Sequence, residues 1–301
     1  MKIFLAGGTG VVGTRALPAM VAAGHDVDAV ARTDAKADLV RSLGGQPVTV
    51  DLFDPDAVRT AVAGSEAVVN LATSIPPLTK AARGSAWVTN ERLRSEASNH
   101  LVDAAVNAGA SRYVQESIAF PYADNADRWI DEDHPVDHVG PFSGARDAEA
   151  AARRFTDSGG AGVVLRFAQF YAPEATHTRA FNATIRRRVN PFVGDPDGYC
   201  SFVHATDAGS AVVAALQAPS GIYNVADDEP LTRADAGRVV AEALGVKPPH
   251  GLPKLVRAAS PGSAKLLMRS LRVSNRRFKE NTGWVPAHPS IRGSWPTDAS
   301  S

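Results

Sequence analysis

Apolar and polar residues follow two different rhythms in the first half of the chain. Short runs rich in β-branched and aromatic residues predict strands at 2–6, 26–31, 46–50, 66–72, 112–117 and 162–168. Between them, helical patterns predict helices near 11–23, 35–43, 55–63, 90–108 and 143–157. This alternation indicates an α/β fold, in which a doubly wound parallel sheet carries helices on both faces.

The rhythm changes after residue 170. A loop at 171–179, a short helix at 180–189 and a turn-rich segment at 190–198 come before a strand at 199–203, a helix at 205–218 and a strand at 221–226. The remainder is helical and interrupted by prolines. We therefore expect residues 1–170 and 199–226 to form a Rossmann-type NAD(P)-binding domain. Residues 171–198 and 227–301 would form a smaller, interleaved C-terminal substrate-binding region.

Composition narrows the class of protein. Lys plus Arg equals Asp plus Glu at 32 each among 301 residues, so charge predicts neither a nucleic-acid nor a membrane partner. The lone cysteine, Cys200, has no internal disulfide partner, and no Cys/His cluster has metal-ligand spacing. No apolar run approaches the roughly 20 residues that span a bilayer. These features favour a cytoplasmic protein that binds a small molecule and no metal.

A glycine-rich segment, "FLAGGTGVVG", follows the first predicted strand and opens the first predicted helix. Gly7, Gly10 and Gly13 permit a tight turn and a close backbone approach to a pyrophosphate, and the helix N-terminus supplies amide donors. The strand before and the helix after make this a dinucleotide-binding turn rather than a flexible loop. We expect the cofactor to be lined by Gly7, Thr9, Gly10, Val11, Val12 and Gly13.

The residue at the end of the second strand bears on the choice of cofactor. NAD-binding proteins usually carry an acidic residue about 20 residues after the turn, whereas an arginine suits the 2′-phosphate of NADP. Here the residue is Arg32, with Lys36 close behind; Asp28 comes too early and Asp34 too late. The pattern favours NADP over NAD, the alternative being that Arg32 is a solvated surface residue.

Taken together, these motifs resemble the extended short-chain dehydrogenases/reductases of the NAD-dependent epimerase/dehydratase family, over nearly the whole length. "VDLFDPDAV", "NLATS", the helix from Asn90, "VLRFAQFYAP" and "SFVHATDAG" appear in the family's order. The resemblance implies that Asp51 and Leu52 flank the adenine. It also implies that Leu71, Ala72 and Thr73 lie along the cofactor.

The catalytic motif departs from that family. A Tyr and a Lys four residues apart would begin the helix at 143–157, and a Ser or Thr would end strand five. Here Phe142, Arg146 and Ile118 stand in those places, and Ser117 is one place early. Phe142 has no proton to transfer and Arg146 stays cationic, although Arg146 remains suited to holding a ribose or a phosphate.

Candidates for the missing proton donor lie near the end of strand five. Tyr122 would need a cation such as Arg146 to lower its pKa, and Glu116 and Ser117 sit where open α/β sheets bind ligands. The alternatives are that Tyr122 packs the loop and that Glu116 and Ser117 have structural roles. Tyr171 and His204 are candidates for the substrate pocket; His204 precedes Asp207 at a helix start, which is also a structural capping pattern.

The sequence therefore supports an enzyme, an NADP(H)-dependent oxidoreductase acting on a small or medium-sized carbonyl or alcohol. Two alternatives remain open: a non-catalytic NADP-binding sensor or regulator, and a sugar-type epimerase with tightly bound cofactor. The resemblance also implies a homodimer formed through the helices at 90–108 and 143–157.

Overall fold

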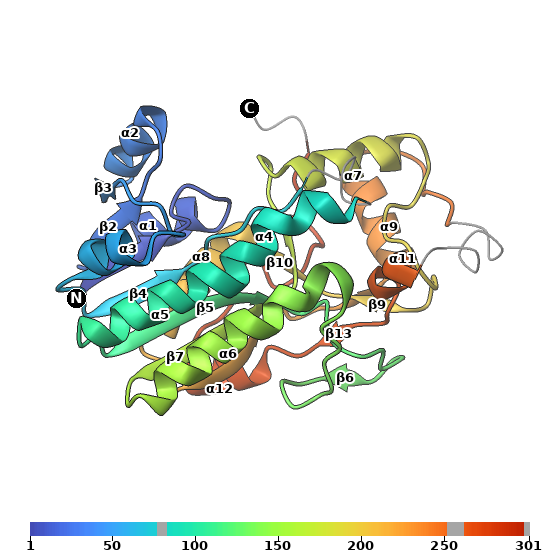
Figure 1. The fold of residues 1–301 in the computed structure, drawn as a ribbon. Helices are drawn as coiled ribbons and strands as arrows, with labels where there is room; N and C mark the ends of the chain where they lie inside the picture. Colours follow the sequence, from blue (N-terminus) through green and yellow to red (C-terminus); the bar gives the residue numbers. More distant parts are fainter. Residues whose placement is uncertain (77–82, 252–261, 298–301) are drawn as a thin grey trace.

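The computed structural model describes residues 1–76, 83–251 and 262–297, and its centre is a sheet of seven strands (Figure 1). The strands are β1 (Lys2–Ala6), β2 (Asp26–Val30), β3 (Gln46–Val48), β4 (Ala67–Asn70), β5 (Arg112–Ile118), β7 (Ala161–Phe167) and β11 (Gly221–Val225). They lie in the order β11-β7-β5-β4-β1-β2-β3, and all neighbouring pairs are parallel. The chain moves outward from β1 in one direction and then from β4 in the other, which confirms the predicted doubly wound fold.

Helices cover both faces of this sheet (Figure 1). One face carries α1 (Gly13–Ala22), α8 (Ala205–Ala215) and α12 (Arg276–Thr282), and the other carries α3 (Pro55–Val62), α5 (Ser98–Asn107) and α6 (Ser143–Asp157). The connection from β2 to β3 is α2 (Asp34–Ser42). The apolar runs read as strands are thus buried on both sides, as a parallel sheet requires.

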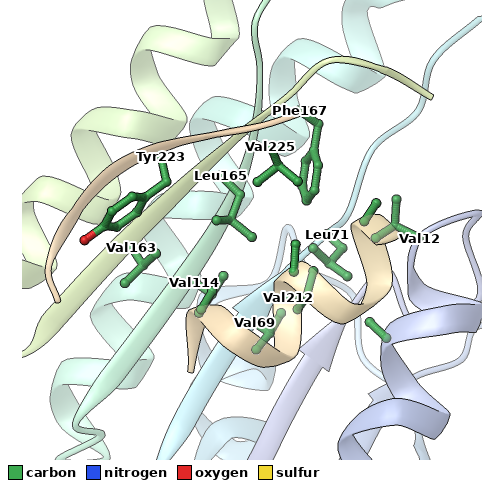
Figure 2. Close-up of a cluster of buried hydrophobic side chains, with 14 of the residues drawn as sticks. Val12, Val69, Leu71, Val114, Val163, Leu165, Phe167, Val212, Tyr223 and Val225 are labelled. Carbon is green, nitrogen blue, oxygen red and sulfur yellow. The ribbon is translucent and has the colours of Figure 1, made fainter. Parts of the chain in front are cut away.

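Alternate residues of each strand fill two separate cores. In β5, Tyr113 belongs to the core under α5 and α6, whereas Val114 belongs to the core under α1 and α8. Figure 2 shows the second core, where Val212 of α8 lies among strand residues such as Val69. Full burial of such a side chain stabilises the fold by about 1.5–3 kcal/mol, so these cores hold the carboxyl ends of the strands in a fixed frame.

The predicted strand at 199–203 divides into two and lies outside the seven-stranded sheet. β9 (Tyr199–Cys200) pairs antiparallel with β12 (Leu231–Thr232), and β10 (Phe202–His204) pairs parallel with β8 (Gln169–Tyr171). The division falls at Ser201, whose hydroxyl donates to the Leu271 carbonyl and accepts from the Val273 amide. This hydroxyl ties the chain to β13 (Arg272–Val273), which pairs with β6 (Trp129–Ile130).

The predicted helix at 90–108 is interrupted in its hydrogen bonding but not in its course. α4 (Val88–Arg92) continues through a π-helical stretch (Leu93–Ala97) into α5. α7 (Thr176–Arg186) begins inside the predicted 171–179 loop. Two 3₁₀ turns (Gly84–Trp87 and Gly140–Phe142) precede α4 and α6, and α9 (Arg233–Ala243) and α11 (Gly262–Leu267) complete the described helices.

A further core lies beyond the main sheet. It combines residues of α7, α9 and the C-terminal segment, among them Ile185, Val240 and Trp295, around Tyr171 and Phe202. The proposed boundary between a nucleotide-binding domain and a substrate-binding region stays a prediction. Within the described ranges, no helix has both the length and the hydropathy that a bilayer crossing requires.

Candidate functional site

The glycine-rich turn between β1 and α1 lies against the end of β4. Gly7 has a φ of +85°, and a Cβ there would come within 2.5 Å of the Leu71 carbonyl, so only glycine fits. A Cβ at Gly13 would collide with the Gly7 carbonyl, whereas one at Gly10 would meet only the Gly7 oxygen, at 3.3 Å. The three glycines therefore serve the turn itself and the close packing of α1 on it.

This turn leaves hydrogen-bond donors free at the helix N-terminus. Gly10 donates to the Gly7 carbonyl at 3.0 Å, while within the described residues the amides of Val11, Val12 and Gly13 donate no hydrogen bond. Free amides at a helix N-terminus are a ready-made site for an anion. The arrangement fits the pyrophosphate of a dinucleotide, and Thr9, half-buried in the same turn, lies beside it in sequence.

Arg32 lies at the end of β2, directly before Thr33, which caps α2 through the Lys36 amide. Arg32 and Lys36 are exposed, and neither side chain has a hydrogen-bond or ion-pair partner within the described residues. Asp28, the earlier acidic residue, forms an ion pair with Lys2 at 3.3 Å. Two free cations and an engaged carboxylate fit a ribose carrying a 2′-phosphate.

The remaining predicted cofactor residues lie at the carboxyl ends of β3 and β4. Leu52 and Leu71 are buried, Ala72 is half-buried, and Asp51 and Thr73 are exposed. The Ala72 amide donates to the Asn70 side chain at 3.1 Å, which holds this strand end. All of them occupy the edge of the sheet at which open α/β folds bind ligands. Their contact with a cofactor stays a prediction.

The start of α6 presents an aromatic ring where the family has its tyrosine. Phe142 is almost fully buried, and its ring stacks on Phe120 of the loop after β5, with centroids 5.9 Å apart and planes at 14°. Arg146 is 67% exposed and only loosely paired with Asp147, at 3.5 Å. Arg146 is thus available to a ribose or phosphate, and the stacked rings are apolar.

α6 receives its N-terminal cap from another helix. Phe142 occupies the capping position and supplies no side-chain bond. Instead, one carboxylate oxygen of Glu91 in α4 accepts from the Gly144 amide at 2.6 Å and from the Ser143 hydroxyl at 2.7 Å. Negative charge at a helix N-terminus is stabilising. No local pattern in the sequence marks Glu91 as this cap, because 53 residues separate it from the amide it binds.

Ser117 is bound into a buried ion pair. Its hydroxyl donates to Glu149 of α6 at 2.7 Å, and the same carboxylate receives two hydrogen bonds from Arg166 of β7, at 2.6 and 2.8 Å. Both members of the pair are only 5% exposed. The predicted catalytic Ser117 therefore lies with its hydroxyl directed at a carboxylate, within the contact between α6 and the sheet.

Tyr122 extends this network. Its hydroxyl donates to the Asn224 side chain at 2.8 Å and accepts from Arg166 at 2.9 Å, and the residue is fully buried. Burial raises the pKa of Tyr122 to about 12, although Arg166 acts in the opposite direction. The cation that contacts this phenol is thus Arg166, not the expected Arg146, and its catalytic role stays a prediction.

Glu116 forms a second buried ion pair. Both of its carboxylate oxygens accept from Arg94 in the π-helical stretch, at 2.7 and 2.8 Å. Burial raises the pKa of Glu116, and Arg94 opposes that rise. The structure brings Glu116, Ser117 and Tyr122 together at one end of β5, as the sequence predicts, but with each polar group engaged within the protein.

The two predicted substrate residues, Tyr171 and His204, lie next to each other, with ring centroids 5.0 Å apart. The buried Tyr171 hydroxyl is paired with Ser294 at 2.8 Å. His204 caps α8 by accepting from the Thr206 amide, and its ring stacks on His288 at 3.9 Å. Asp207 accepts from the Nδ1 of His288 at 3.0 Å. Their roles toward a substrate stay predictions.

Comparison with known proteins also finds the epimerase/dehydratase family and two similar reductases. Residues 3–226 match the model of the NAD dependent epimerase/dehydratase family. A Streptomyces protein named 3-diazoavenalumate denitrifying reductase is 34% identical over 303 residues, which covers 97% of this chain and 98% of that one. A ketoreductase of a farnesylated quinoline oxide from Stigmatella aurantiaca is 30% identical over 155 residues, or 51% of this chain and 44% of that one.

Solved structures share the fold. A human epimerase family protein with NADPH superposes with a TM-score of 0.80 at 24% identity, and the match covers 98% of both chains. The UDP-glucose 4-epimerase of Thermus thermophilus with NAD gives a TM-score of 0.77 at 21% identity, covering 97% of this chain and 96% of that one. These neighbours carry a nicotinamide cofactor in either form.

Proposed function

Because the chain belongs to the NAD-dependent epimerase/dehydratase family, we propose that it is an NADP(H)-dependent reductase whose substrate takes no proton from the usual tyrosine position. The observation that carries the proposal is the Phe142 ring, which stacks on Phe120 at that position. The free Arg32 and Lys36 favour the phosphorylated cofactor. When bound, the nicotinamide supplies a hydride, and the remaining question is which acceptor suits this site.

The other proton-bearing groups near β5 are engaged elsewhere. Ser117 donates to Glu149, Tyr122 donates to Asn224, and Glu116 is held by Arg94. Reduction of a carbonyl consumes one proton for each hydride, and a positioned acid typically contributes about 10²–10⁴-fold to such a rate. The reduction rate of an acceptor that needs no proton does not suffer from the lack of an acid at a site lined by Phe120 and Phe142. The chain's own side chains thus favour such an acceptor.

A diazo-derived acceptor meets this condition. In the net reaction an arenediazonium ion and NADPH give the arene, dinitrogen and NADP⁺: the C–N bond breaks, a C–H bond forms, and no proton is consumed. The Streptomyces relative is named as a denitrifying reductase of a diazo compound, and it matches this chain over almost its whole length. We propose an aromatic diazonium compound as the substrate class.

The test compares two acceptors with two proteins. The wild type should consume NADPH and release dinitrogen from a carboxyarenediazonium salt well above the rate without protein, while reducing aromatic ketones poorly. The Phe142→Tyr/Arg146→Lys variant restores the family's pair; it should gain ketone reduction without a comparable gain on the diazonium salt. Efficient ketone reduction by the wild type, or no turnover of the diazonium salt, contradicts the proposal.

A non-catalytic sensor is the second candidate, favoured by the same replacement of tyrosine by Phe142. It requires NADPH binding without turnover on any acceptor of the panel. A sugar epimerase is less well supported, because oxidation and re-reduction at one centre need the missing acid and base in both directions. Epimer formation from UDP-sugars by the wild type would restore that alternative.

We further propose that the protein is a cytoplasmic homodimer. The family resemblance motivates a dimer formed through the helices predicted at 90–108 and 143–157, of which α5 and α6 lie side by side on one face of the sheet (Figure 1). Exposed positions on these helices include Asn99, Ala150 and Val106. Light scattering should give twice the chain mass, and Ala150→Arg should shift the protein to a monomer without loss of NADPH affinity.

A further inference from the structure

Three arginines are buried in the described part of the chain, and one of them differs from the others. Arg94, Arg166 and Arg233 are each only 3–4% exposed. Arg94 and Arg166 each bind a carboxylate through two hydrogen bonds or more, to Glu116 and to Glu149. Arg233, the first residue of α9, has no carboxylate partner among the described residues.

The hydrogen bonds of Arg233 leave part of its guanidinium unsatisfied. Its Nη2 donates to the carbonyls of Arg269 and Leu267, at 2.6 and 3.4 Å. Its Nη1 is buried and has no hydrogen-bond partner in the described structure; Nη1 of Arg94 is unsatisfied too, but the charge of Arg94 is paired with Glu116. Burial of a cation without an opposite charge is unfavourable, and burial accordingly lowers the pKa of Arg233. A chain that pairs its other two buried arginines has retained an unpaired cation here.

Nearby acidic groups do not neutralise it. Asp124 and Asp195 act on Arg233 through their charge, but no ion pair joins either of them to it. The Asp124 carboxylate accepts from the amides of Ser270 and Ala126, at 2.7 and 3.0 Å. Asp195 accepts from the Asp197 amide at 3.1 Å. Nη1 of Arg233 therefore receives no anionic partner from the described part of the chain.

Two glycines shape the surroundings of the guanidinium. A Cβ at Gly194 would lie 2.8 Å from Nε of Arg233, and one at Gly198 would lie 2.5 Å from Nη1. Gly194 also has a φ of +133°, which other residues rarely adopt. The loop between these glycines thus presents bare backbone to the cation. The backbone of Gly198 thus packs directly against Nη1, and an entering anion would take the place of this backbone contact.

The segment that holds Arg233 also holds the loop of the proposed active site. Arg269, whose carbonyl accepts from Arg233, donates from its own side chain to the carbonyls of Pro121 and Tyr122, at 3.3 and 3.2 Å. Pro121 follows Phe120, which stacks on Phe142. One segment therefore joins the unpaired cation to the aromatic wall where the hydride acceptor is proposed to lie.

From these observations we propose that Arg233 is an anion subsite that binds a carboxylate or phosphate group of the substrate. That the bound anion belongs to a substrate rests on the proposed function. The anion subsite itself depends only on Arg233 and on the glycine loop 194–198 that packs against it. The unsatisfied Nη1 carries N–H donors of a permanent cation, and charge-assisted hydrogen bonds from such donors to either oxyanion are short and strong. Binding would supply the partner that Arg233 lacks, so a charged substrate gains where an uncharged isostere does not.

The experiment measures binding to the full-length protein with NADPH present. The probes are benzoate with benzamide as its uncharged isostere, and UDP with uridine; calorimetry gives each dissociation constant. Arg233→Gln removes the charge, and Arg238→Gln is the control one turn along α9, where the exposed arginine already pairs with Asp235. Benzoate or UDP should bind more tightly than its uncharged partner. That advantage should fall by roughly tenfold or more in Arg233→Gln and persist in Arg238→Gln.

The pattern of results separates the possible anions and the two proposals. An Arg233-dependent preference for benzoate identifies a carboxylate, and one for UDP identifies a phosphate; either supports the subsite. Equal affinities in wild type and Arg233→Gln, or no anion preference at all, overturn it. If Arg233→Gln does not fold, Arg233→Lys keeps the charge but loses the paired donors, and the anion preference should weaken. Turnover of the diazonium salt with NADPH is measured in parallel, so failure of the proposed function shows as absent turnover and leaves the anion preference to be judged by itself.

Discussion

At the scale of single residues, the hydroxyl of Tyr122 decides between two accounts of proton supply. It bridges Arg166 and Asn224 inside the core, so its removal takes the partner from the Asn224 oxygen and leaves Nη1 of Arg166 only a 3.4 Å contact to the Glu132 carbonyl. We expect Tyr122→Phe to lower the free energy of unfolding by about 1–3 kcal/mol. NADPH turnover on the diazonium salt should change far less than the roughly 100-fold or greater loss that follows removal of a general acid.

The matched control for this change is Tyr223→Phe. The Tyr223 hydroxyl donates to the Pro219 carbonyl at 3.0 Å, outside the Arg166 network, and the residue is buried in the core under α8 and α12. Urea unfolding and turnover are measured on both variants. A stable Tyr122→Phe protein that binds NADPH and has lost its turnover would instead make Tyr122 the replacement acid.

Arg32 carries the choice between the two nicotinamide cofactors. A guanidinium that is free of partners binds a 2′-phosphate through charge-assisted hydrogen bonds, each worth about 1.5–3 kcal/mol. Arg32→Asp should therefore weaken NADPH binding by roughly 10–100-fold, with NADH affinity unchanged or higher. Fluorescence titration with both cofactors measures the ratio. Arg41→Gln removes an arginine already paired with Asp38 in α2 and should leave that ratio as it is; NADH preferred by the wild type would refute the assignment.

Short sequence patterns were enough to identify some of these residues as candidates. Arg32 follows a strand at a fixed distance from the glycine turn, and Phe142 opens a helix. The partners of Ser117 and Glu116 could not be predicted in this way. Glu149 lies 32 residues from Ser117 and Arg94 lies 22 residues from Glu116, and nothing in the sequence links a strand to a particular residue of a helix packed upon it.

At the scale of elements, the Glu149–Arg166 pair joins α6 to β7 and receives the Ser117 hydroxyl of β5. Removing one member leaves the other charge buried and uncompensated. Glu149→Gln should lower the free energy of unfolding by about 3–5 kcal/mol. The Glu149→Leu/Arg166→Met double variant should lose clearly less than the sum of its single changes. Denaturant unfolding of the wild type, Glu149→Leu, Arg166→Met and the double variant measures the coupling, and strictly additive losses would show that the pair does not act as a unit.

The elements themselves were predictable where burial dictates them. The seven parallel strands are short apolar runs, and the caps Thr33, Asp54 and Thr232 mark helix starts by their side-chain oxygens. The strand at 199–203 misled because its division depends on Ser201, whose hydroxyl binds β13 some 70 residues away. The π-helical stretch likewise has no pattern of its own in the sequence.

At the scale of the whole molecule, the C-terminal segment returns to the nucleotide-binding core at His288. Asp207 of α8 accepts from the amides of Ala287 and His288, both at 2.9 Å, and from the His288 ring. His204, at the start of the same helix, stacks on that ring. The sequence showed His204 and Asp207 three residues apart. It gave no sign of His288, because that contact exists only once the chain has closed upon itself.

This closure predicts a dependence of stability on acid. Burial, and then the neighbouring His288, lower the pKa of His204 to about 4, with Arg15 acting in the same direction and Asp207 and Glu174 opposing it. An unfolded histidine has a pKa near 6.5. Above that value both states are neutral and the stability is intact. As the pH falls from about 6.5 towards 4, the unfolded chain binds a proton that the folded chain refuses, and stability is lost.

His204→Asn tests this directly, because asparagine also caps helices well and does not titrate. The variant should lose less stability than the wild type when urea unfolding is compared at about pH 7 and pH 5. The control is His250→Asn, a change at an exposed position, which should leave the wild-type difference unaltered. If His204→Asn instead loses as much stability between about pH 7 and pH 5 as the wild type, the acid sensitivity comes from other groups. The imidazole of His204 would then bind protons equally in the folded and unfolded states.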